Sequence, residues 1–291
     1  MIESIPMVNS AEVITKIDKG FSRDQKYILD YKYLLRIYPI DEIDKRKVEF
    51  ETLKKLAEIS NLIPKPIEFG KGYMILTYLP GEDGEEALRS LTKQEQYIAG
   101  LSAGRELRKL HQLDAPQGYP SWYKVKKEKS DNYLNELKKL DLDQGLCSLL
   151  QHYIKDNEPI MKDRPNKFQH DDFHPSNLLI YQKKFSGIID FQRMDWGDPI
   201  HDLQKLGFFS VQVSIPFTNG IVDGYSKEKP TQAFWELYTL YCAMHVVSAL
   251  VWGKKMGSEQ FDLLYNHSLS VIDDHDHFSK LIPSWYEKQQ I

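Results

Sequence analysis

The sequence predicts an α+β fold of two lobes, a β-rich N-terminal lobe over residues 1–79 and a mainly helical C-terminal lobe over residues 80–291. Short apolar runs separated by turn residues fill the first part, which is typical of antiparallel strand pairs. Pro80-Gly81 interrupts regular structure and suits a hinge between the lobes. Beyond it, apolar residues recur mostly at helical spacing over long segments.

Two strand pairs are predicted in the N-terminal lobe. Residues 26–29 and 33–38 are apolar runs on either side of Asp30-Tyr31-Lys32, which favours a hairpin. Residues 67–70 and 73–78 predict a second pair that leads directly into the hinge. These strands would form the sheet of the lobe.

Helices are predicted where apolar residues recur every three or four positions. Residues 11–17 are expected to form a short helix, and residues 42–60 a longer one that ends before two prolines. Residues 92–113 predict a long helix, and Thr92 with Glu95 forms a capping box at its start. A loop is expected over residues 117–129, and further helices over residues 131–140, 143–157, 231–256 and 261–272.

The stretch His170-Asp171-Asp172-Phe173-His174-Pro175-Ser176-Asn177 reads H-x-D-x-x-x-x-N, the spacing of a kinase catalytic loop. Phosphoryl transfer needs one carboxylate to orient and deprotonate an attacking hydroxyl. It also needs an amide oxygen, a short loop away, to hold a metal ion on the nucleotide phosphates. Asp172 and Asn177 supply these two groups.

A second carboxylate follows in a position where it can join the first two residues. Residues 178–181 and 185–190 are apolar runs joined by Gln182-Lys183-Lys184, which predicts a hairpin. A hairpin returns its last residue beside its first, so Asp190 is expected near Asn177. Two oxygen ligands for a metal would then face one pocket.

Two other interpretations of this stretch remain open. His170 and His174 are four residues apart, as in a helical H-E-x-x-H zinc site. Pro175 disfavours the helical conformation at His174 and so opposes zinc. The second alternative is a loop of turn-forming Asp and Asn residues without catalytic function, which leaves Asp190 unexplained.

Composition and charge restrict the classes of function. Charged residues make up 27% of the chain, which is ordinary for a soluble protein, and the net charge is −4. Residues 170–291 carry 10 basic and 15 acidic residues, which argues against a nucleic-acid partner and would suit a cationic substrate. Residues 242–252, the longest apolar stretch, are too short to span a bilayer. Together with an N-terminus that lacks a secretory pattern, this favours the cytoplasm, with no membrane and no partner protein implied.

The pattern HDDFHPSNLLI…GIIDFQRMDWGDPIHDL resembles the aminoglycoside phosphotransferase family, which includes relatives acting on macrolides, choline, homoserine and methylthioribose. The resemblance covers residues 12–275 and implies a bilobal protein-kinase-like fold. It implies Mg²⁺-dependent transfer of the γ-phosphoryl of ATP or GTP to a small-molecule hydroxyl acceptor. An aminoglycoside is the expected acceptor; a nucleotide-binding module without turnover is the alternative.

The resemblance also assigns roles to individual residues. Asp172 would be catalytic, Asn177 and Asp190 would hold Mg²⁺, and Asp202 would be structural and brace the catalytic loop. The nucleotide-binding residues would be Gly20 and Ser22 in a phosphate-covering loop, Arg36 paired with Glu49, and Thr77 and Leu79 at the adenine edge. Arg36 departs from the lysine that is commoner in the family at this strand position, which puts the geometry of phosphate binding in doubt.

Overall fold

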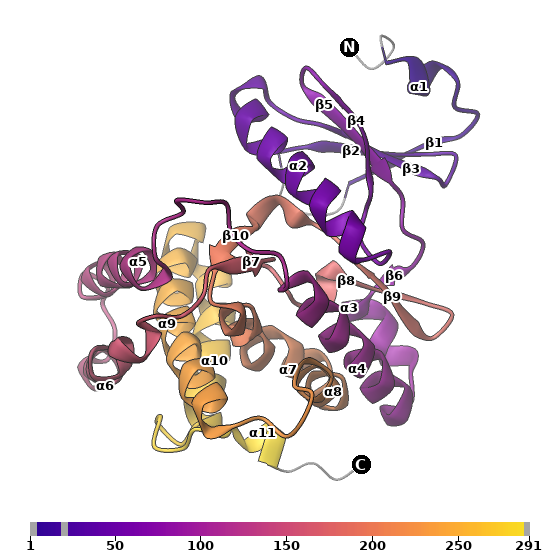
Figure 1. The fold of residues 1–291 in the computed structure, drawn as a ribbon. Coiled ribbons are helices and arrows are strands. Elements are labelled where there is room, and N and C mark those ends of the chain that lie inside the picture. Colours follow the sequence, from indigo (N-terminus) through magenta and orange to yellow (C-terminus); the bar gives the residue numbers. More distant parts are fainter. Residues whose placement is uncertain (1–4, 19–22, 288–291) are drawn as a thin grey trace.

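The computed structural model of the chain describes residues 5–18 and 23–287, and it divides into a β-rich N-terminal part and a mainly helical remainder (Figure 1). The N-terminal elements are α1 (Pro6–Asn9), β1 (Ile14–Ile17), β2 (Gln25–Leu29), β3 (Tyr33–Ile37), α2 (Ile43–Ile59), β4 (Pro66–Gly70) and β5 (Tyr73–Thr77). The strands form one antiparallel sheet in the order β1-β2-β3-β5-β4. The predicted α+β architecture is confirmed.

The two faces of this sheet bury different clusters. Leu29, Leu35 and Ile75 point to one face and pack with residues of α1. Met74 and Leu76 point to the other face and join the large core that continues into the C-terminal part. Neighbouring side chains of a strand point to opposite faces, so this second face also carries Lys26 and Arg36 toward the rest of the molecule.

The C-terminal part is built mainly of helices, with short strands at its junction with the sheet (Figure 1). Its helices are α3 (Gly84–Ala87), α4 (Lys93–Leu110), α5 (Trp122–Leu137), α6 (Gln144–Asn157), α7 (Val211–Val213), α8 (Ile215–Tyr225), α9 (Gln232–Met256), α10 (Ser258–Asp274) and α11 (Ser284–Glu287). Its strands are β6 (Glu82–Asp83), β7 (Lys167–Gln169), β8 (Leu178–Tyr181), β9 (Lys184–Ile188) and β10 (Asp195–Gly197), and the 3₁₀ segment η7 spans Pro199–Lys205.

The helices that support the site pack closely. The Thr92 capping box is present at the start of α4, as predicted. Helices α4 and α8 cross at glycines, because a Cβ on Gly104 would lie 2.1 Å from the carbonyl oxygen of Ile221. Gly224 makes the reciprocal approach to the carbonyl of Leu101. Any larger residue at these positions would separate the two backbones.

Helix α9 is the one helix in the described ranges that is long and apolar enough to cross a membrane. Its most apolar stretch is 78% buried inside the protein, where it packs against α5, α6 and α10. That burial identifies α9 as a core helix. Its apolar side chains therefore form the centre of the core of the helical part.

Two expected elements are wrong. Residues 11–17 do not form a helix; Ile14–Ile17 is the edge strand β1, paired with β2. Its β-branched residues suit a strand, and pairing with a preformed neighbour outweighs the weak propensity of a short segment. Residues 117–129 are not one loop, because α5 begins at Trp122 and continues through the lysines to Leu137. Lysine is a good helix former, so the lysine-rich segment after Trp122 can continue the helix.

Candidate active site

The catalytic loop, residues 170–177, connects β7 to β8 and is held by the buried carboxylate of Asp202. The oxygens of Asp202 accept hydrogen bonds from the backbone N–H groups of His170 at 2.6 Å and Asp171 at 2.7 Å. His111 Nε2 lies 3.0 Å from the same carboxylate. Asp171 takes a left-handed φ of 56°, which Asp tolerates better than most residues. Asp202 thus has the bracing position that the sequence predicts.

The side chain of Asp172 lies at the edge of the core with 18% of its surface exposed. Lys205, at the end of η7, donates to its Oδ1, and His174 Nε2 lies 3.5 Å from the same oxygen. Arg193 Nε lies 3.7 Å from Oδ2. Burial opposes ionisation, but the hydrogen bond from His174 and the charge of Lys205 hold the pKa of Asp172 well below its usual range. Asp172 is therefore a carboxylate at neutral pH.

The hairpin of β8 and β9 brings Asn177 and Asp190 together, as predicted. Leu178 lies opposite Ile188 in the register, and the backbone N–H of Ile189 donates to the carbonyl of Asn177 at 3.0 Å. Asp190 is the next residue and takes a left-handed φ of 65°. That conformation ends the strand and leaves Asp190 next to Asn177, where both side chains can serve one metal site.

These two side chains fit a magnesium ion by their donor chemistry. The Nδ2 group of Asn177 donates to the backbone carbonyl of Asp172 at 2.9 Å and to its Oδ2 at 3.2 Å, which leaves the amide oxygen as a ligand. The carboxylate of Asp190 is 30% exposed and lies 3.6 Å from Lys26 Nζ. Carboxylate and amide oxygens are the ligands that Mg²⁺ takes, so the residues present suit the ion that the sequence predicts.

The geometry removes the basis of the zinc interpretation. His174 has extended backbone angles, and His170 lies in the loop before it, so the two do not share a helix face. His170 Nε2 lies 2.9 Å from the carbonyl of Ile189, and burial lowers its pKa. His170 is thus a neutral donor that links the catalytic loop to the segment carrying Asp190.

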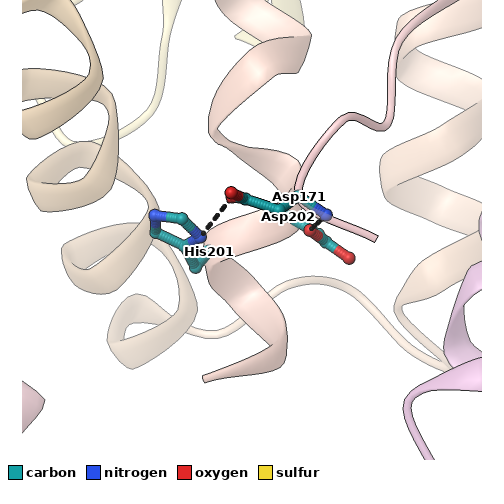
Figure 2. Close-up of side chains that lie close together, drawn as sticks. All are labelled: Asp171, His201 and Asp202. Carbon is teal, nitrogen blue, oxygen red and sulfur yellow. Dashed lines mark hydrogen bonds and ion pairs between the residues drawn. The ribbon is translucent and has the colours of Figure 1, made fainter. Parts of the chain in front are cut away.

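Asp171, His201 and Asp202 form a cluster whose oxygens and nitrogens are close enough for a metal (Figure 2). Figure 2 shows the ring of His201 directed at the carboxylate of Asp171, 3.5 Å away, and Asp202 directed at the backbone of Asp171. Both oxygens of Asp202 are already acceptors. The other ring nitrogen of His201 lies 2.6 Å from Lys126 Nζ. Hydrogen bonds therefore explain this cluster without an ion.

Arg36 lies in the sheet on the side of the catalytic loop and pairs with Glu49 of α2, as predicted. Its Nη1 lies 2.5 Å from Glu49 Oε1, and Nε and Nη2 lie 3.0 Å and 2.6 Å from Asp24 Oδ2. Arg46 joins the same group through contacts with Asp24, Glu42 and Glu49. Burial opposes the charge of Arg36, but Glu49 and Asp24 raise its pKa above the ordinary value.

The remaining nucleotide-binding predictions concern Gly20, Ser22, Thr77 and Leu79. Gly20 and Ser22 lie outside the described residues. The backbone N–H of Thr77 donates to the carbonyl of Lys65 at 2.8 Å, so this amide is already used within the fold. Leu79 lies two residues beyond the end of β5, where the chain leaves the sheet. Its place at an adenine edge stays a prediction.

Sequence reasoning did not single out four basic side chains of the site: Lys26, Lys126, Arg193 and Lys205. Lys205 follows Asp202 by three residues, but no sequence motif predicts that this 3₁₀ segment places the Lys205 ammonium beside Asp172. Lys26 could have been found, because a hairpin centred on Tyr31 places residue 26 opposite Arg36. Neighbours across an antiparallel pair share a face of the sheet.

Comparison with known proteins finds solved structures of similar fold. The gentamicin complex of APH(2")-IIa superimposes with a TM-score of 0.67 at 17% identity, covering 89% of this chain and 91% of that chain. A choline/ethanolamine kinase family protein from Mesorhizobium loti has a TM-score of 0.72 at 16% identity, covering 99% and 97%. The macrolide 2'-phosphotransferase MphH from Brachybacterium faecium has a TM-score of 0.62 at 14% identity, covering 89% and 92%.

These similarities establish the kinase-like fold and no acceptor, since all three identities are low. No curated protein sequence matches the chain. The profile described as the phosphotransferase enzyme family matches residues 13–238, which include the catalytic loop, the hairpin and the segment that braces them. The chain therefore belongs to the phosphotransferase enzyme family and is a small-molecule phosphotransferase.

Proposed function

We propose that this protein transfers the γ-phosphoryl group of ATP or GTP to a hydroxyl of a small molecule. The observation that carries the proposal is the convergence of an ionised carboxylate, Asp172, with the oxygen ligands of Asn177 and Asp190. Solved neighbours include complexes with ATP, ADP and GDP, which supports a nucleotide as the donor. Magnesium, when bound by Asn177 and Asp190, supplies positive charge to the phosphates.

Asp172 orients the acceptor hydroxyl and takes its proton as the oxygen bonds to the γ-phosphorus. The bond from that phosphorus to the β-phosphate oxygen breaks, and the nucleoside diphosphate leaves. The low pKa makes Asp172 a weak base, which suits this reaction. In a loose transition state the hydroxyl needs orientation more than early deprotonation.

We propose that the nucleotide binds where residues 1–79 meet residues 80–291, with the acceptor on the side of the second lobe. The first lobe supplies the buried pair Arg36 and Glu49, and the second supplies the catalytic loop. The nucleotide roles of Gly20, Ser22, Thr77 and Leu79 belong to this proposal. A location in the cytoplasm accords with a nucleotide substrate and with the burial of α9.

The acceptor class rests on two opposing observations. Neighbours in complex with gentamicin and kanamycin favour an aminoglycoside, as does the acidic excess after residue 170. The charges beside Asp172 favour a different alcohol, because Lys205 and Arg193 both face this carboxylate. A polycation would meet two like charges there, which reduces its affinity. We therefore place neutral and anionic alcohols ahead of aminoglycosides.

A screen for nucleoside diphosphate release tests the function. The purified protein is incubated with Mg-ATP or Mg-GTP and panels of aminoglycosides, macrolides, choline, homoserine and sugars. Release that depends on one class of alcohol supports the proposal and names the acceptor. Nucleotide binding without release above background for any alcohol would favour a binding module without turnover. Activity that does not require Mg²⁺ would contradict the mechanism.

A further inference from the structure

The buried charges around Arg36 leave no net positive charge for a phosphate. Arg36 and Arg46 contribute two cations, and Asp24, Glu42 and Glu49 contribute three carboxylates. The side chain of Arg36 is only 4% exposed, and its Nε and both terminal nitrogens contact these carboxylates. Reorienting Arg36 toward a phosphate would take one of two cations from the buried carboxylates of Asp24 and Glu49, which is costly.

Lys26 offers a charge in the same place without that cost. It lies on β2 directly opposite Arg36 in the register, so both side chains leave the sheet on the same face. Its ammonium lies 3.6 Å from Asp190 Oδ2, the predicted metal ligand. Within residues 5–18 and 23–287, Lys26 is the residue that forms an ion pair with Asp190.

The surroundings of Lys26 suit a ligand that arrives with its own charge. The side chain is 15% exposed, and the carboxylate it faces is 30% exposed, so the pair borders solvent. A lysine presents three donors on a flexible stem and can exchange one acceptor for another. Because the Lys26 ammonium lies 3.6 Å from Asp190 and carries three donors, it can donate to phosphate oxygens whether or not a metal holds that carboxylate.

We infer that Lys26, rather than Arg36, binds the phosphate groups of the nucleotide, and that Arg36 holds β3 to α2 through Glu49 and Asp24. The inference rests on the proposed function for its ligand. It assigns the phosphate-binding cation to the neighbouring strand, where it replaces the strand lysine that this chain lacks at position 36. The positive charge at the phosphate site then comes from β2 instead of β3.

The test compares nucleotide binding by variants of the full chain, measured by calorimetry with ADP, ATP and adenosine. Lys26→Ala should weaken ADP and ATP by about 10- to 100-fold, the loss of one hydrogen bond to a charged group. Adenosine affinity should change less than about 2-fold, since no phosphate is present. Lys26→Arg should restore most of the loss. Lys16→Ala, on the adjacent strand with its side chain 56% exposed, is the matched control and should bind like the wild type.

Removing the metal with EDTA distinguishes direct phosphate binding by Lys26 from an indirect effect of Lys26 on the predicted metal ligand Asp190. If Lys26 contacts phosphate, Lys26→Ala still weakens ADP in EDTA; an effect that vanishes in EDTA would overturn the inference. Arg36→Lys keeps a cation but not the fork of donors, so it should lower the melting temperature more than it changes ADP affinity. ADP binding within 2-fold of wild type in Lys26→Ala, with a 10-fold loss in a folded Arg36→Lys, would also overturn it. Failure of the wild type to bind ATP or GTP would instead contradict the proposed function.

Discussion

Replacing Asp202 by asparagine tests whether one buried carboxylate holds the catalytic loop. In the wild type, Asp202 Oδ1 accepts from the N–H of Asp171, and Oδ2 accepts from the N–H of His170 and from His111. The amide of asparagine keeps its oxygen where two donors converge, at the position of Oδ2. Its NH₂ group then faces the N–H of Asp171, so two donors oppose each other.

The magnitude follows from these contacts. One charge-assisted hydrogen bond is lost, which costs about 1.5–3 kcal/mol, and the others weaken because their acceptor is no longer charged. We therefore expect Asp202→Asn to lower the free energy of unfolding by about 2–4 kcal/mol. Because Asp171 precedes Asp172, the displacement reaches the catalytic carboxylate, and kcat should fall by about 10- to 100-fold since small misplacements are costly.

Urea unfolding measures the stability, and amide hydrogen exchange locates the change. Exchange should accelerate first at Asp171, while the amides of the N-terminal sheet keep their wild-type protection. Asp262→Asn removes the same charge from an exposed position on α10 and should shift stability by less than about 0.5 kcal/mol. Wild-type stability and wild-type loop exchange in Asp202→Asn would refute the reasoning.

Two further predictions concern the metal and the pH dependence. Asp190→Ala should raise the Mg²⁺ concentration needed for half-maximal activity, which a magnesium titration of diphosphate release measures; an unchanged requirement would remove Asp190 from the metal site. Burial lowers the pKa of Lys126 from 10.5 to about 7, so between these values the unfolded chain binds more protons and stability rises with pH. The rise is at most about 1.4 kcal/mol per pH unit and should be smaller in Lys126→Met, as urea midpoints at pH 7 and pH 9 would reveal; equal slopes in both proteins would exclude it.

The sequence predicts those parts of the site whose chemistry depends on local residue spacing. The H-x-D-x-x-x-x-N loop and the hairpin after it are short-range features, so their residues could be placed beside one another from turn geometry alone. The pairing of Arg36 with Glu49 required the helix after β3 to pack on the sheet, and the structure contains that pair.

The features that sequence reasoning missed depend on tertiary packing. β1 is a strand because β2 pairs with it, and the sequence of residues 11–17 does not identify that partner. Lys205 reaches Asp172 only because η7 packs against the catalytic loop. Arg36 donates two hydrogen bonds to Asp24, a residue twelve positions earlier, and no local sequence pattern predicts this contact. The proposals for the phosphate-binding cation and the acceptor rest on the last two of these contacts.

The most direct test of the catalytic assignment is the turnover of Asp172→Asn with the acceptor found in the screen. The variant keeps the size of the side chain and removes its charge. We predict that kcat falls by about 10²- to 10⁴-fold, the usual contribution of a positioned acid–base group, while nucleotide affinity stays within a few-fold of wild type. A variant that keeps more than about a tenth of the wild-type kcat would contradict the account, because Asp172 would then not be the group that receives the proton.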